Sequence, residues 1–474
     1  MVNNVENSAE PCVIQKYTDL ARQLLCGLAQ EKGSTLKVYI ATFGCQQNEA
    51  DSERLLGTAL LLGYEKTTEI ESADLIIYNT CAVREHAELK ALSKTGQLKK
   101  LKQNNKHLLV GLWGCMVSKE DRVDEIKHKY PYVDFVAGTN MLHRLPEILC
   151  DVLINKRRRF YVDDKDYPTV EGVPVERQNH LKAYVSIMYG CDNFCTYCIV
   201  PYVRGRERSR KKECIIAEVK QLVENGYKEI TLLGQNVNSY GKGLDGKTDF
   251  ASLVEEICKI EGDFTIRFMT SHPKDVSDEL IRVIAENQKV ERHFHLPVQS
   301  GSSKILKSMN RKYTRVGYLE TVRKLRANVP GIVLTTDIIV GFPGETNEDF
   351  EETLSLVDEV KFDGVFSFIY SKRPGTPACT YEDFVTDQEK SQRMSRLLAL
   401  HRENITKINA SYVGKTVRVL CEEEKAKDGT YGGKTSSFKL VRFESKKENL
   451  YGKYVDVKIE KFSESMLYGK AVEV

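Results

Sequence analysis

The sequence lacks the segments that would place a protein in a membrane. No run of about 18 apolar residues occurs in the 474-residue chain, so we expect no membrane-spanning helix. The first residues, MVNNVENSAEPC, have no basic start followed by an apolar stretch, which argues against a signal peptide. Together these absences predict a cytoplasmic protein with no membrane partner.

A strong net charge is also missing. The chain has 70 Lys and Arg against 67 Asp and Glu, a net charge of +3, so total charge identifies no partner. The positions of the basic clusters matter more than their sum. With 41% hydrophobic and 29% charged residues the composition is that of a soluble globular protein, and the length predicts about three domains.

Cysteine, by contrast, is abundant, with 13 in the chain. Disulfides are rare in a reducing cytosol, so this number indicates metal binding or redox chemistry. The stretch YGCDNFCTYCIV spaces Cys191, Cys195 and Cys198 as C-x3-C-x2-C, one ligand short of a tetrahedral site. A structural zinc site would need another ligand, and Cys214 is the nearest candidate. An iron–sulfur cluster is the alternative, and with three protein ligands it would leave one iron open to a small molecule.

Three short apolar runs in the N-terminal part each end in a cysteine and each predict a buried strand: 37–45, 73–81 and 107–115. Helical patterns at 50–64 and 84–102 separate them, so we expect a parallel sheet. Because the carboxyl ends of parallel strands share one edge, Cys45, Cys81 and Cys115 should converge there. The alternative is three unrelated buried cysteines.

The middle of the chain predicts a second α/β domain. A helix is expected at 13–30, ahead of the first domain, and residues 151–180 mix charge, Pro and Gly without periodicity, which indicates a linker. Six strands are predicted beyond it: 182–190, 229–236, 265–271, 293–299, 333–342 and 364–371. With helices between them they favour a partial (β/α)6 barrel whose cysteine motif follows the first strand, at the end where barrels carry their chemistry.

The last part of the chain changes character. A helix at 384–410 is expected to lead out of the barrel. From 411 onwards short strands separated by turn residues predict a small all-β barrel. Residues 404–474 carry 14 Lys and Arg against 10 Asp and Glu, so this end is mildly basic.

Several motifs resemble a known family. GCDNFCTYCIVP resembles the cluster motif of the radical S-adenosylmethionine (SAM) enzymes. Over nearly the whole chain, further motifs are similar to the methylthiotransferase family within that superfamily: GCQQNEADSERL, NTCAVREHAE, GCMVSKE, RGRERSR, LPVQSGSSKILKSMNR and DIIVGFPGET. The terminal barrel resembles a TRAM domain. GCQQNE and NTCAVREHAE are most similar to the MiaB branch, which acts on tRNA, whereas the ribosomal-protein branch usually carries GCPKN at the first site.

The resemblance implies an architecture of three parts. These are an N-terminal parallel α/β domain at 36–150, a central partial (β/α)6 radical-SAM barrel at 181–403 and a TRAM-like RNA-binding β-barrel at 411–474. It also implies two [4Fe-4S] clusters. Cys191, Cys195 and Cys198 would hold the radical-generating cluster, whose open iron binds SAM, and Cys45, Cys81 and Cys115 would hold an auxiliary cluster.

The implied reaction adds a methylthio group to carbon 2 of N6-isopentenyladenosine 37 in tRNA. One SAM would supply the methyl group and a second the 5′-deoxyadenosyl radical. The same chemistry on N6-threonylcarbamoyladenosine 37 of tRNA, or on a ribosomal-protein aspartate, is an alternative. An alternative of another class is a non-catalytic RNA-binding protein with structural metal sites.

Polar residues at predicted strand ends are candidates for binding SAM. They are Gly234, Gln235, Asn236, Ser271, Gln299, Asp337 and Glu345, joined by Arg204 from the basic segment after the cysteine motif. Each has an alternative interpretation as a strand-end cap or turn residue.

Basic and aromatic residues are candidates for binding RNA by phosphate contact and stacking. They are Arg206 and Arg208 in VRGRERSRKK, and Phe438, Lys439 and Arg442 in KTSSFKLVRF. The expected partners are the tRNA anticodon stem-loop, an electron donor such as flavodoxin or ferredoxin, and a sulfur donor or cluster-repair protein.

Overall fold

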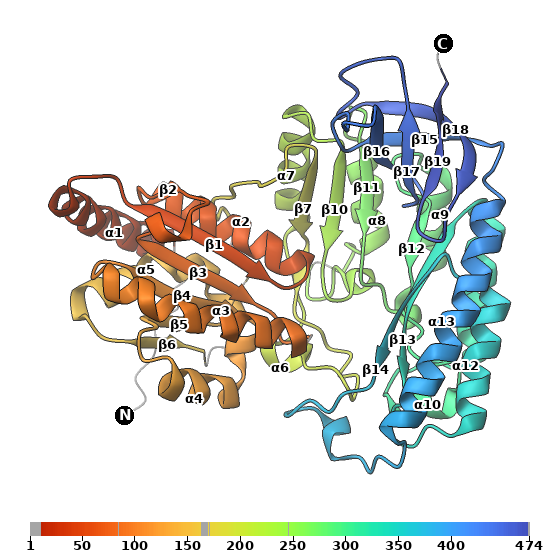
Figure 1. Ribbon diagram of the computed structural model, residues 1–474, viewed down its shortest axis with the longest axis horizontal. Coiled ribbons are helices and arrows are strands. Elements are labelled where there is room, and N and C mark those ends of the chain that lie inside the picture. The colour runs from red at the N-terminus through yellow and green to blue at the C-terminus, as the bar shows by residue number, and fades with distance from the viewer. Residues whose placement is uncertain (1–10, 84, 163–168, 170, 245, 473–474) are drawn as a thin grey trace. The chain divides into compact units, whose positions relative to one another are not determined.

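The computed structural model describes residues 11–83, 85–162, 169, 171–244 and 246–472 (Figure 1). The chain divides into two compact units. The first comprises 1–178, 188–192 and 198–210, and the second comprises 179–187, 193–197 and 211–474. Within the described ranges, no helix combines the length and apolar composition needed to cross a membrane.

The first unit is built on a six-stranded parallel sheet in the order β2-β1-β3-β4-β5-β6. Its strands are β1 (Lys37–Phe43), β2 (Glu65–Lys66), β3 (Leu75–Thr80), β4 (Leu109–Gly114), β5 (Phe135–Ala137) and β6 (Arg159–Tyr161). The three predicted strands are β1, β3 and β4, at the centre. The sequence did not predict β2, β5 and β6, which have only two or three residues each and so show no periodicity.

Helices cover both faces of this sheet. The cores show that α1 (Pro11–Lys32), α2 (Gln46–Leu61) and α5 (Leu145–Asn155) pack on one face, and α3 (Glu85–Asn104) and α4 (Glu120–Lys129) on the other. Strand β4 contributes side chains to the hydrophobic cores on both faces, since Trp113 belongs to the first core and Val110 and Leu112 to the second. The helix predicted at 13–30 lies within α1.

The predicted linker begins later than expected. Residues 151–155 continue α5, and 159–161 form β6, so the prediction of a linker from 151 is wrong over its first part. The cause is tertiary: Arg159 of the charged run KRRRF forms an ion pair with Asp151 of α5, which places charged residues on an edge strand.

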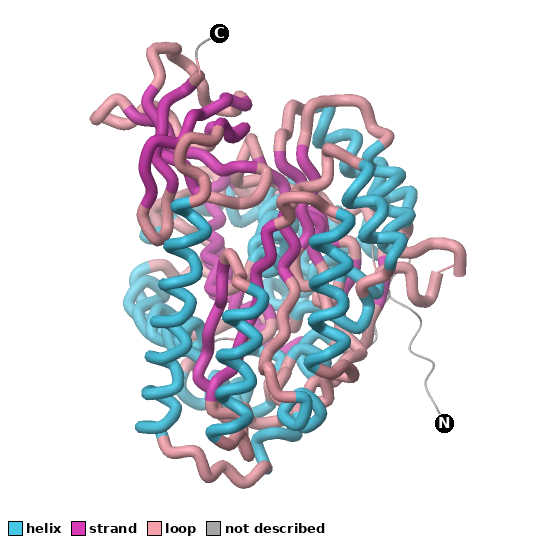
Figure 2. The backbone as a smooth tube through the Cα atoms, turned by 90° about the vertical axis from the view of Figure 1, so that its right-hand side faces the viewer, coloured by secondary structure: helices cyan, strands magenta, loops and turns pink. Residues whose placement is uncertain are grey.

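The second unit contains the six strands predicted for the partial barrel. They form two parallel sheets, β11-β10-β7 and β12-β13-β14, and a parallel bridge between Ile266 and Val290 links the two. The strands are β7 (Lys182–Ser186), β10 (Glu229–Leu233), β11 (Thr265–Phe268), β12 (His293–His295), β13 (Val333–Val340) and β14 (Gly364–Ile369). Figure 2 shows strands of this unit beside a row of helices.

Side chains alternate between the two faces of these strands. Phe268 packs edge-on against Phe250 of α8 (Phe250–Cys258), so that face is apolar and covered by helices. The opposite, inner face carries polar side chains such as Arg267, His295 and Asp337. A polar inner face in a barrel indicates a place where ligands bind rather than a packed core. The remaining helices are α7 (Lys212–Glu224), α9 (Asp278–Glu286), α10 (Ser303–Ser308), α11 (Arg315–Asn328) and α12 (Asn347–Val360).

Helix α13 (Asp387–Ala410) leads into a small closed β-barrel, as predicted, and its five strands lie in the order β15-β16-β17-β19-β18. Its strands are β15 (Thr416–Cys421), β16 (Thr430–Thr435), β17 (Leu440–Glu444), β18 (Tyr454–Phe462) and β19 (Leu467–Ala471). The sequence TYGGKT of β16 was not predicted as a strand because glycine weakens strands. Here glycine is required, since a Cβ on Gly433 would lie 2.1 Å from the Leu420 carbonyl oxygen.

Candidate active site

The three N-terminal cysteines converge at one edge of the first sheet. Cys45 lies two residues beyond β1, and Cys81 and Cys115 directly follow β3 and β4. In the register Thr80 is opposite both Phe43 and Gly114, so the strands end side by side. The Cys45 and Cys81 thiols form a hydrogen bond, and Cys115 is close enough for its charge to act on Cys81. The convergence expected from the sequence is present.

Two buried asparagines hold these loops together. Asn48 Nδ2 donates to Asn79 Oδ1 at 3.0 Å and to the Thr80 carbonyl at 3.1 Å, while Asn79 Nδ2 donates to the Asn48 carbonyl at 2.8 Å. Asn48 Oδ1 in turn accepts from the Cys45 backbone N at 3.4 Å. Neither asparagine is among the predicted site residues. Their position inside two cysteine motifs was the available signal.

Gly114 allows the end of β4 to approach the end of β3 closely. Its φ of +103° lies in the region that favours glycine, and a Cβ there would lie 2.4 Å from the Thr80 carbonyl oxygen. The Cys115 backbone N donates to that same carbonyl at 2.9 Å. Glycine before Cys115 thus lets the β4 end pack directly against the β3 end.

Arg204 lies beside the N-terminal cysteines and not in the SAM-binding site where it was predicted. It ends α6 (Val200–Arg204), its side chain is buried, and its Nε donates to Cys115 Sγ at 3.2 Å. Its Nη2 forms an ion pair with Asp51 Oδ2 at 2.9 Å. The prediction that Arg204 contacts SAM is therefore corrected: its guanidinium is engaged by Cys115 and Asp51. A run of charge along the sequence cannot show which of its arginines turns inward.

Electrostatics favour thiolate at one of the three sulfurs. The hydrogen bond with Cys81 and the positive charge of Arg204 lower the pKa of the Cys45 thiol. Burial raises the pKa of Cys115, against the opposing effect of Arg204. A cationic group whose charge acts on Cys45 and Cys115 is the environment that stabilises thiolate ligands.

These residues fit a cluster held by three thiolates. In the part of the chain that the structure describes, no three His, Cys, Asp or Glu side chains are arranged to hold one metal ion. Ligands of a cluster bind different irons and need not meet at one point. The three-cysteine edge, with Cys81 and Cys115 buried and Cys45 exposed, provides soft ligands, and Arg204 provides a compensating charge. This is the donor chemistry an iron–sulfur cluster requires.

The second unit gathers polar groups at the carboxyl ends of its strands. Asn236, beyond β10, and Ser271 and His272, beyond β11, are buried. Four buried atoms here have no hydrogen-bond partner among the described residues: Gln235 Oε1, Asn236 Oδ1, Ser271 Oγ and His272 Nε2. Burial, followed by the charge of Arg311, lowers the pKa of His272 to about 2, so its ring is neutral. Unpaired buried polar atoms at one edge fit a polar ligand such as SAM.

The other predicted residues of this edge lie on neighbouring segments. The Gly234 carbonyl accepts from Thr270 Oγ1, and the Gln299 backbone N donates to the Asp337 carbonyl at 2.8 Å. Thr270 and Gln299 have φ of +67° and +70°, which non-glycine residues seldom adopt and which concentrate at functional sites.

Arg311 is a site residue that the sequence did not single out, although it ends the quoted motif LPVQSGSSKILKSMNR. It is buried, and its Nη1 donates to Cys195 Sγ at 3.4 Å while its Nη2 donates to the Pro297 carbonyl at 2.8 Å. Its Nε donates to Tyr313 Oη at 2.9 Å, and the Tyr313 ring packs edge-on against His272. Cys195 and the unpaired polar atoms thus share neighbours.

The C-x3-C-x2-C cysteines are divided between the units, with Cys191 and Cys198 in the first and Cys195 in the second. The Cys191 backbone N donates to the Gly205 carbonyl at 3.2 Å. Between the cysteines, Phe194 has a φ of +47°. Ligation of one cluster by all three stays a prediction.

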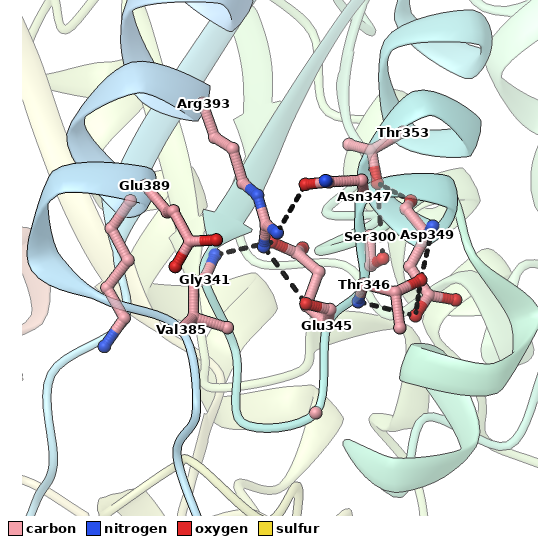
Figure 3. A network of polar contacts seen from close by, with 12 residues as sticks. Ser300, Gly341, Glu345, Thr346, Asn347, Asp349, Thr353, Val385, Glu389 and Arg393 are labelled. Carbon is pink, nitrogen blue, oxygen red and sulfur yellow. Dashed lines mark hydrogen bonds and ion pairs between the residues drawn. The ribbon is translucent and has the colours of Figure 1, made fainter.

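Glu345 has protein partners in place of the predicted cofactor. Its Oε2 accepts from the Gly341 backbone N at 2.8 Å and from Arg393 Nη1 at 2.9 Å (Figure 3). The carboxylate therefore ties the GFPGET loop to α13. The prediction that Glu345 binds SAM is corrected on this ground, since a strand-end motif does not reveal a partner about fifty residues away.

Two of the five predicted RNA contacts point inward. Phe438 stacks on His293 with centroids 5.1 Å apart and lies 4.6 Å from the Arg267 guanidinium. Lys439 is buried and pairs with Asp363 Oδ1 at 2.9 Å. Both prediction errors have one cause: this face of the terminal barrel packs on residues at or near the amino-terminal ends of β11, β12 and β14, so these side chains are not available to RNA.

The other three stay predictions. Arg206 is exposed and forms an ion pair with Asp192 at 3.1 Å. Arg208 Nη2 donates to Asn140 Oδ1 at 2.9 Å, and Arg442, half-buried, pairs with Glu423 at 3.2 Å.

Three family descriptions match this chain in sequence. Residues 37–138 match the uncharacterized protein family UPF0004, residues 185–357 the Radical SAM superfamily and residues 410–472 the TRAM domain. Among solved structures, a radical SAM methyltransferase from Kitasatospora setae has a TM-score of 0.55 at 15% identity, covering 73% of this chain and 75% of that one. The cobalamin-dependent SAM radical enzyme OxsB has a TM-score of 0.52 at 16% identity, covering 81% of this chain and 57% of that one. These likenesses concern the fold.

Curated relatives match over almost the full length. Proteins named tRNA-2-methylthio-N(6)-dimethylallyladenosine synthase are 50% identical to this chain in Thermoanaerobacter pseudethanolicus, over 94% of each chain, and in Alkaliphilus oremlandii, over 98% of each. The relative of that name in Clostridium tetani is 50% identical over 92% of this chain and 96% of its own. With half of its residues shared over this length, and with Cys45, Cys81 and Cys115 gathered at one sheet edge as predicted, the chain belongs to the methylthiotransferase family of radical SAM enzymes.

Proposed function

We propose that this protein adds a methylthio group to carbon 2 of N6-dimethylallyladenosine 37 in tRNA. The observation that carries the proposal is the convergence of Cys45, Cys81 and Cys115 on one sheet edge, in a chain that has a second three-cysteine motif. Two sites that each lack a fourth ligand suit two [4Fe-4S] clusters with one open iron apiece. Relatives of the same length are named for this reaction.

The proposed SAM contacts are Gln235, Asn236, Ser271, Gln299 and Asp337, with the Gly234 backbone. When bound, SAM and the clusters supply the radical and the methyl group, a step that general acids and bases cannot perform on an aromatic C–H. The protein's part is to bind and to exclude water. Support comes from the unpaired buried atoms of Gln235, Asn236 and Ser271, which SAM would supply with partners.

The inner face of β14 supports an apolar N6 substituent on the base. Phe366 lies opposite Asp337 of β13, and Phe368 lies opposite Ile339. The Phe366 ring packs edge-on against His295 at 5.7 Å, which places it on the inner face. Phe366 and Phe368 are 48% and 42% exposed. Exposed aromatic side chains favour a flat base and a dimethylallyl group over a polar threonylcarbamoyl group.

For RNA, we propose contacts to the anticodon stem-loop by Arg206, Arg208 and Arg442. The TRAM match at 410–472 supports tRNA as the partner. An electron donor such as flavodoxin or ferredoxin, and a sulfur donor or cluster-repair protein, complete the proposed partners, since reductive cleavage of SAM consumes electrons and the product gains sulfur. All of these partners suit a cytoplasmic enzyme.

The test is metal and sulfide content on anaerobically reconstituted protein. Wild type is compared with Cys191→Ala/Cys195→Ala/Cys198→Ala and with Cys45→Ala/Cys81→Ala/Cys115→Ala. We expect about eight irons in wild type and about half in each triple variant. Zinc in place of iron, or a triple variant with unchanged iron, would overturn the two-cluster function and favour a binding protein with structural metal sites.

Nucleoside analysis of tRNA from a deletion strain separates the substrates. We expect the methylthiolated form of dimethylallyladenosine to disappear and the unmethylthiolated form to accumulate. Loss of a methylthiolated threonylcarbamoyladenosine, or of a modified ribosomal-protein aspartate, would assign the alternative substrate instead.

A further inference from the structure

One buried arginine faces each of the two cysteine sites. Arg204 Nε lies 3.2 Å from Cys115 Sγ, and Arg311 Nη1 lies 3.4 Å from Cys195 Sγ. The two arginines come from unrelated elements, one from α6 and the other from the segment after α10. Both are 4% exposed. An arginine is almost never buried without a specific partner, so its presence at both sites is a repeated arrangement.

Further hydrogen bonds and an ion pair hold each guanidinium in place. Arg204 Nη2 pairs with Asp51, whose other carboxylate oxygen accepts from Gln47 Nε2 at 3.0 Å. Arg311 is held by the Pro297 carbonyl and by Tyr313 Oη. The guanidinium planes are therefore positioned before any cluster binds, and an N–H already points at a ligand sulfur.

The segment that carries Arg204 also carries a cysteine of the other motif. Cys198 lies two residues before α6, and Ile199 and Val203 pack against Cys115 and Ala82 in one apolar cluster. Thr139 Oγ1 donates to the Val203 carbonyl at 3.0 Å. α6 is thus packed on the Cys81 and Cys115 loops, which holds Arg204 at a set distance from Cys115.

A cation and an N–H···S bond at a cysteine ligand have a defined effect on a cluster. Reduction adds negative charge, and a buried positive group stabilises the reduced form most where water is excluded. Hydrogen bonds to the sulfurs and the net local charge set the reduction potential of iron–sulfur clusters. Removing the arginine should make the cluster harder to reduce, and removing Asp51 should make it easier to reduce.

We propose that Arg204 and Arg311 are positioning residues that set the reduction potentials of the auxiliary and the radical-generating cluster, acting through Cys115 and Cys195 respectively. The proposal rests on the two-cluster function. It assigns the two arginines to different clusters, so substitution of one arginine should change the reduction potential of one cluster only.

The test is a redox titration followed by electron paramagnetic resonance, with one cluster present at a time. Arg204→Gln and Asp51→Asn are made in the Cys191→Ala/Cys195→Ala/Cys198→Ala protein, which keeps the auxiliary cysteines. Arg204→Gln should lower the ratio of reduced to oxidised cluster at a given potential about tenfold, a shift of about 59 mV for one electron. Asp51→Asn should shift the potential in the opposite direction. Arg204→Lys, which keeps the charge, should shift it less than Arg204→Gln.

Each of the two triple-cysteine variants also provides a matched control. Arg311→Gln in the Cys45→Ala/Cys81→Ala/Cys115→Ala protein should lower the potential of the radical-generating cluster. Arg204→Gln in that protein, and Arg311→Gln in the other, should leave the potential unchanged. Iron and sulfide content, measured first, separates this proposal from the proposed function: iron missing from the parent triple variants contradicts the clusters themselves.

Two results would overturn the proposal with the clusters in place. One is a potential that does not move in Arg204→Gln while the protein retains about four irons. The other is a shift of the same sign in Arg204→Gln and Asp51→Asn, because a charge effect requires opposite signs. If Arg204→Gln fails to retain its cluster, the opposite shifts expected of Asp51→Asn and Arg204→Lys still decide the question.

Discussion

At the scale of single residues, the buried amides Asn48 and Asn79 show what the sequence can and cannot predict. They are as buried as the leucines around them, but their removal has another cost, because an amide left without its partner in a core costs about 1–3 kcal/mol. The sequence predicted that Cys45, Cys81 and Cys115 converge, since spacing and strand ends carry that information. It could not predict the amides, Arg204 or Arg311, because their roles depend on contacts between residues 31 to 153 positions apart.

Asn79→Ala should destabilise the first unit by about 2 kcal/mol, because a buried N–H of Asn48 Nδ2 and the Asn48 carbonyl lose their Asn79 partner. It should also remove about half of the iron, because the Cys45 and Cys81 loops lose their connection. Denaturant unfolding and iron analysis measure the two effects. Asn328→Ala, at the exposed end of α11, is the control and should change neither. Full iron content in Asn79→Ala would show that the amide pair does not position the cysteines.

His293 predicts a pH dependence of stability. Burial, with the charges of Arg267, His295 and Lys439, lowers the pKa of His293 to about 3, against 6.5 for an ordinary histidine. The unfolded chain therefore binds a proton that the folded protein does not, and stability falls as pH drops below 6.5 towards 3. Each such histidine costs about 1.4 kcal/mol per pH unit in this window.

The measurement compares unfolding free energies of wild type and His293→Gln between pH 7.5 and pH 5. The wild type should lose more stability than the variant as pH falls, because the variant lacks this proton uptake. His107→Gln alters an exposed histidine and is the control. Parallel pH dependences of wild type and His293→Gln would contradict a neutral, buried His293.

At the scale of elements, periodicity predicted the central strands of both units and the long helices, because each buries one face in a regular pattern. It missed the two- and three-residue strands β2, β5 and β6 and the glycine-rich β16, since their pairing comes from neighbours rather than from their own sequence. Helix α13 was predicted, but its anchor was not: Arg393 reaches Glu345 and also Asn347 Oδ1 at 2.9 Å (Figure 3).

Substitution of two arginines of α13 should lower the free energy of unfolding by very different amounts. Arg393→Met leaves the Glu345 carboxylate buried without its ion pair, and breaking such a pair costs about 3–5 kcal/mol. Arg396→Met removes an ion pair with Glu351 in which both side chains are more than half exposed, which costs at most about 1 kcal/mol. Both arginines also lie over the Phe350 ring, so the comparison isolates the carboxylate. Equal losses in urea unfolding would show that the buried pair is not what anchors α13.

At the scale of the molecule, the sequence predicted the order of its parts but not how the terminal barrel packs on the strands of the partial barrel within the second unit. Ion pairs and hydrogen bonds link it to the amino-terminal ends of strands, as between Tyr454 Oη and Thr265 Oγ1 at 2.7 Å. Basic and aromatic residues in the sequence of a small β-barrel are equally consistent with an RNA-binding surface and with an intramolecular interface. Only the partners distinguish the two, and Phe438 has His293, Arg267 and Lys434 around its ring.

Phe438→Ala tests this interface directly. Loss of a fully buried phenyl ring costs about 3–5 kcal/mol, so loss of the half-buried Phe438 ring should cost less. The loss falls on the contact between the terminal barrel and the strands. Hydrogen exchange in β16, β17 and the first residues of β11 and β12 should therefore become faster. Phe384→Ala, which truncates a side chain that is 78% exposed, should leave exchange in these strands unchanged. Weaker tRNA binding by Phe438→Ala with no change in exchange would instead make Phe438 an RNA contact, because only a ring facing the nucleic acid would weaken binding without loosening the interface.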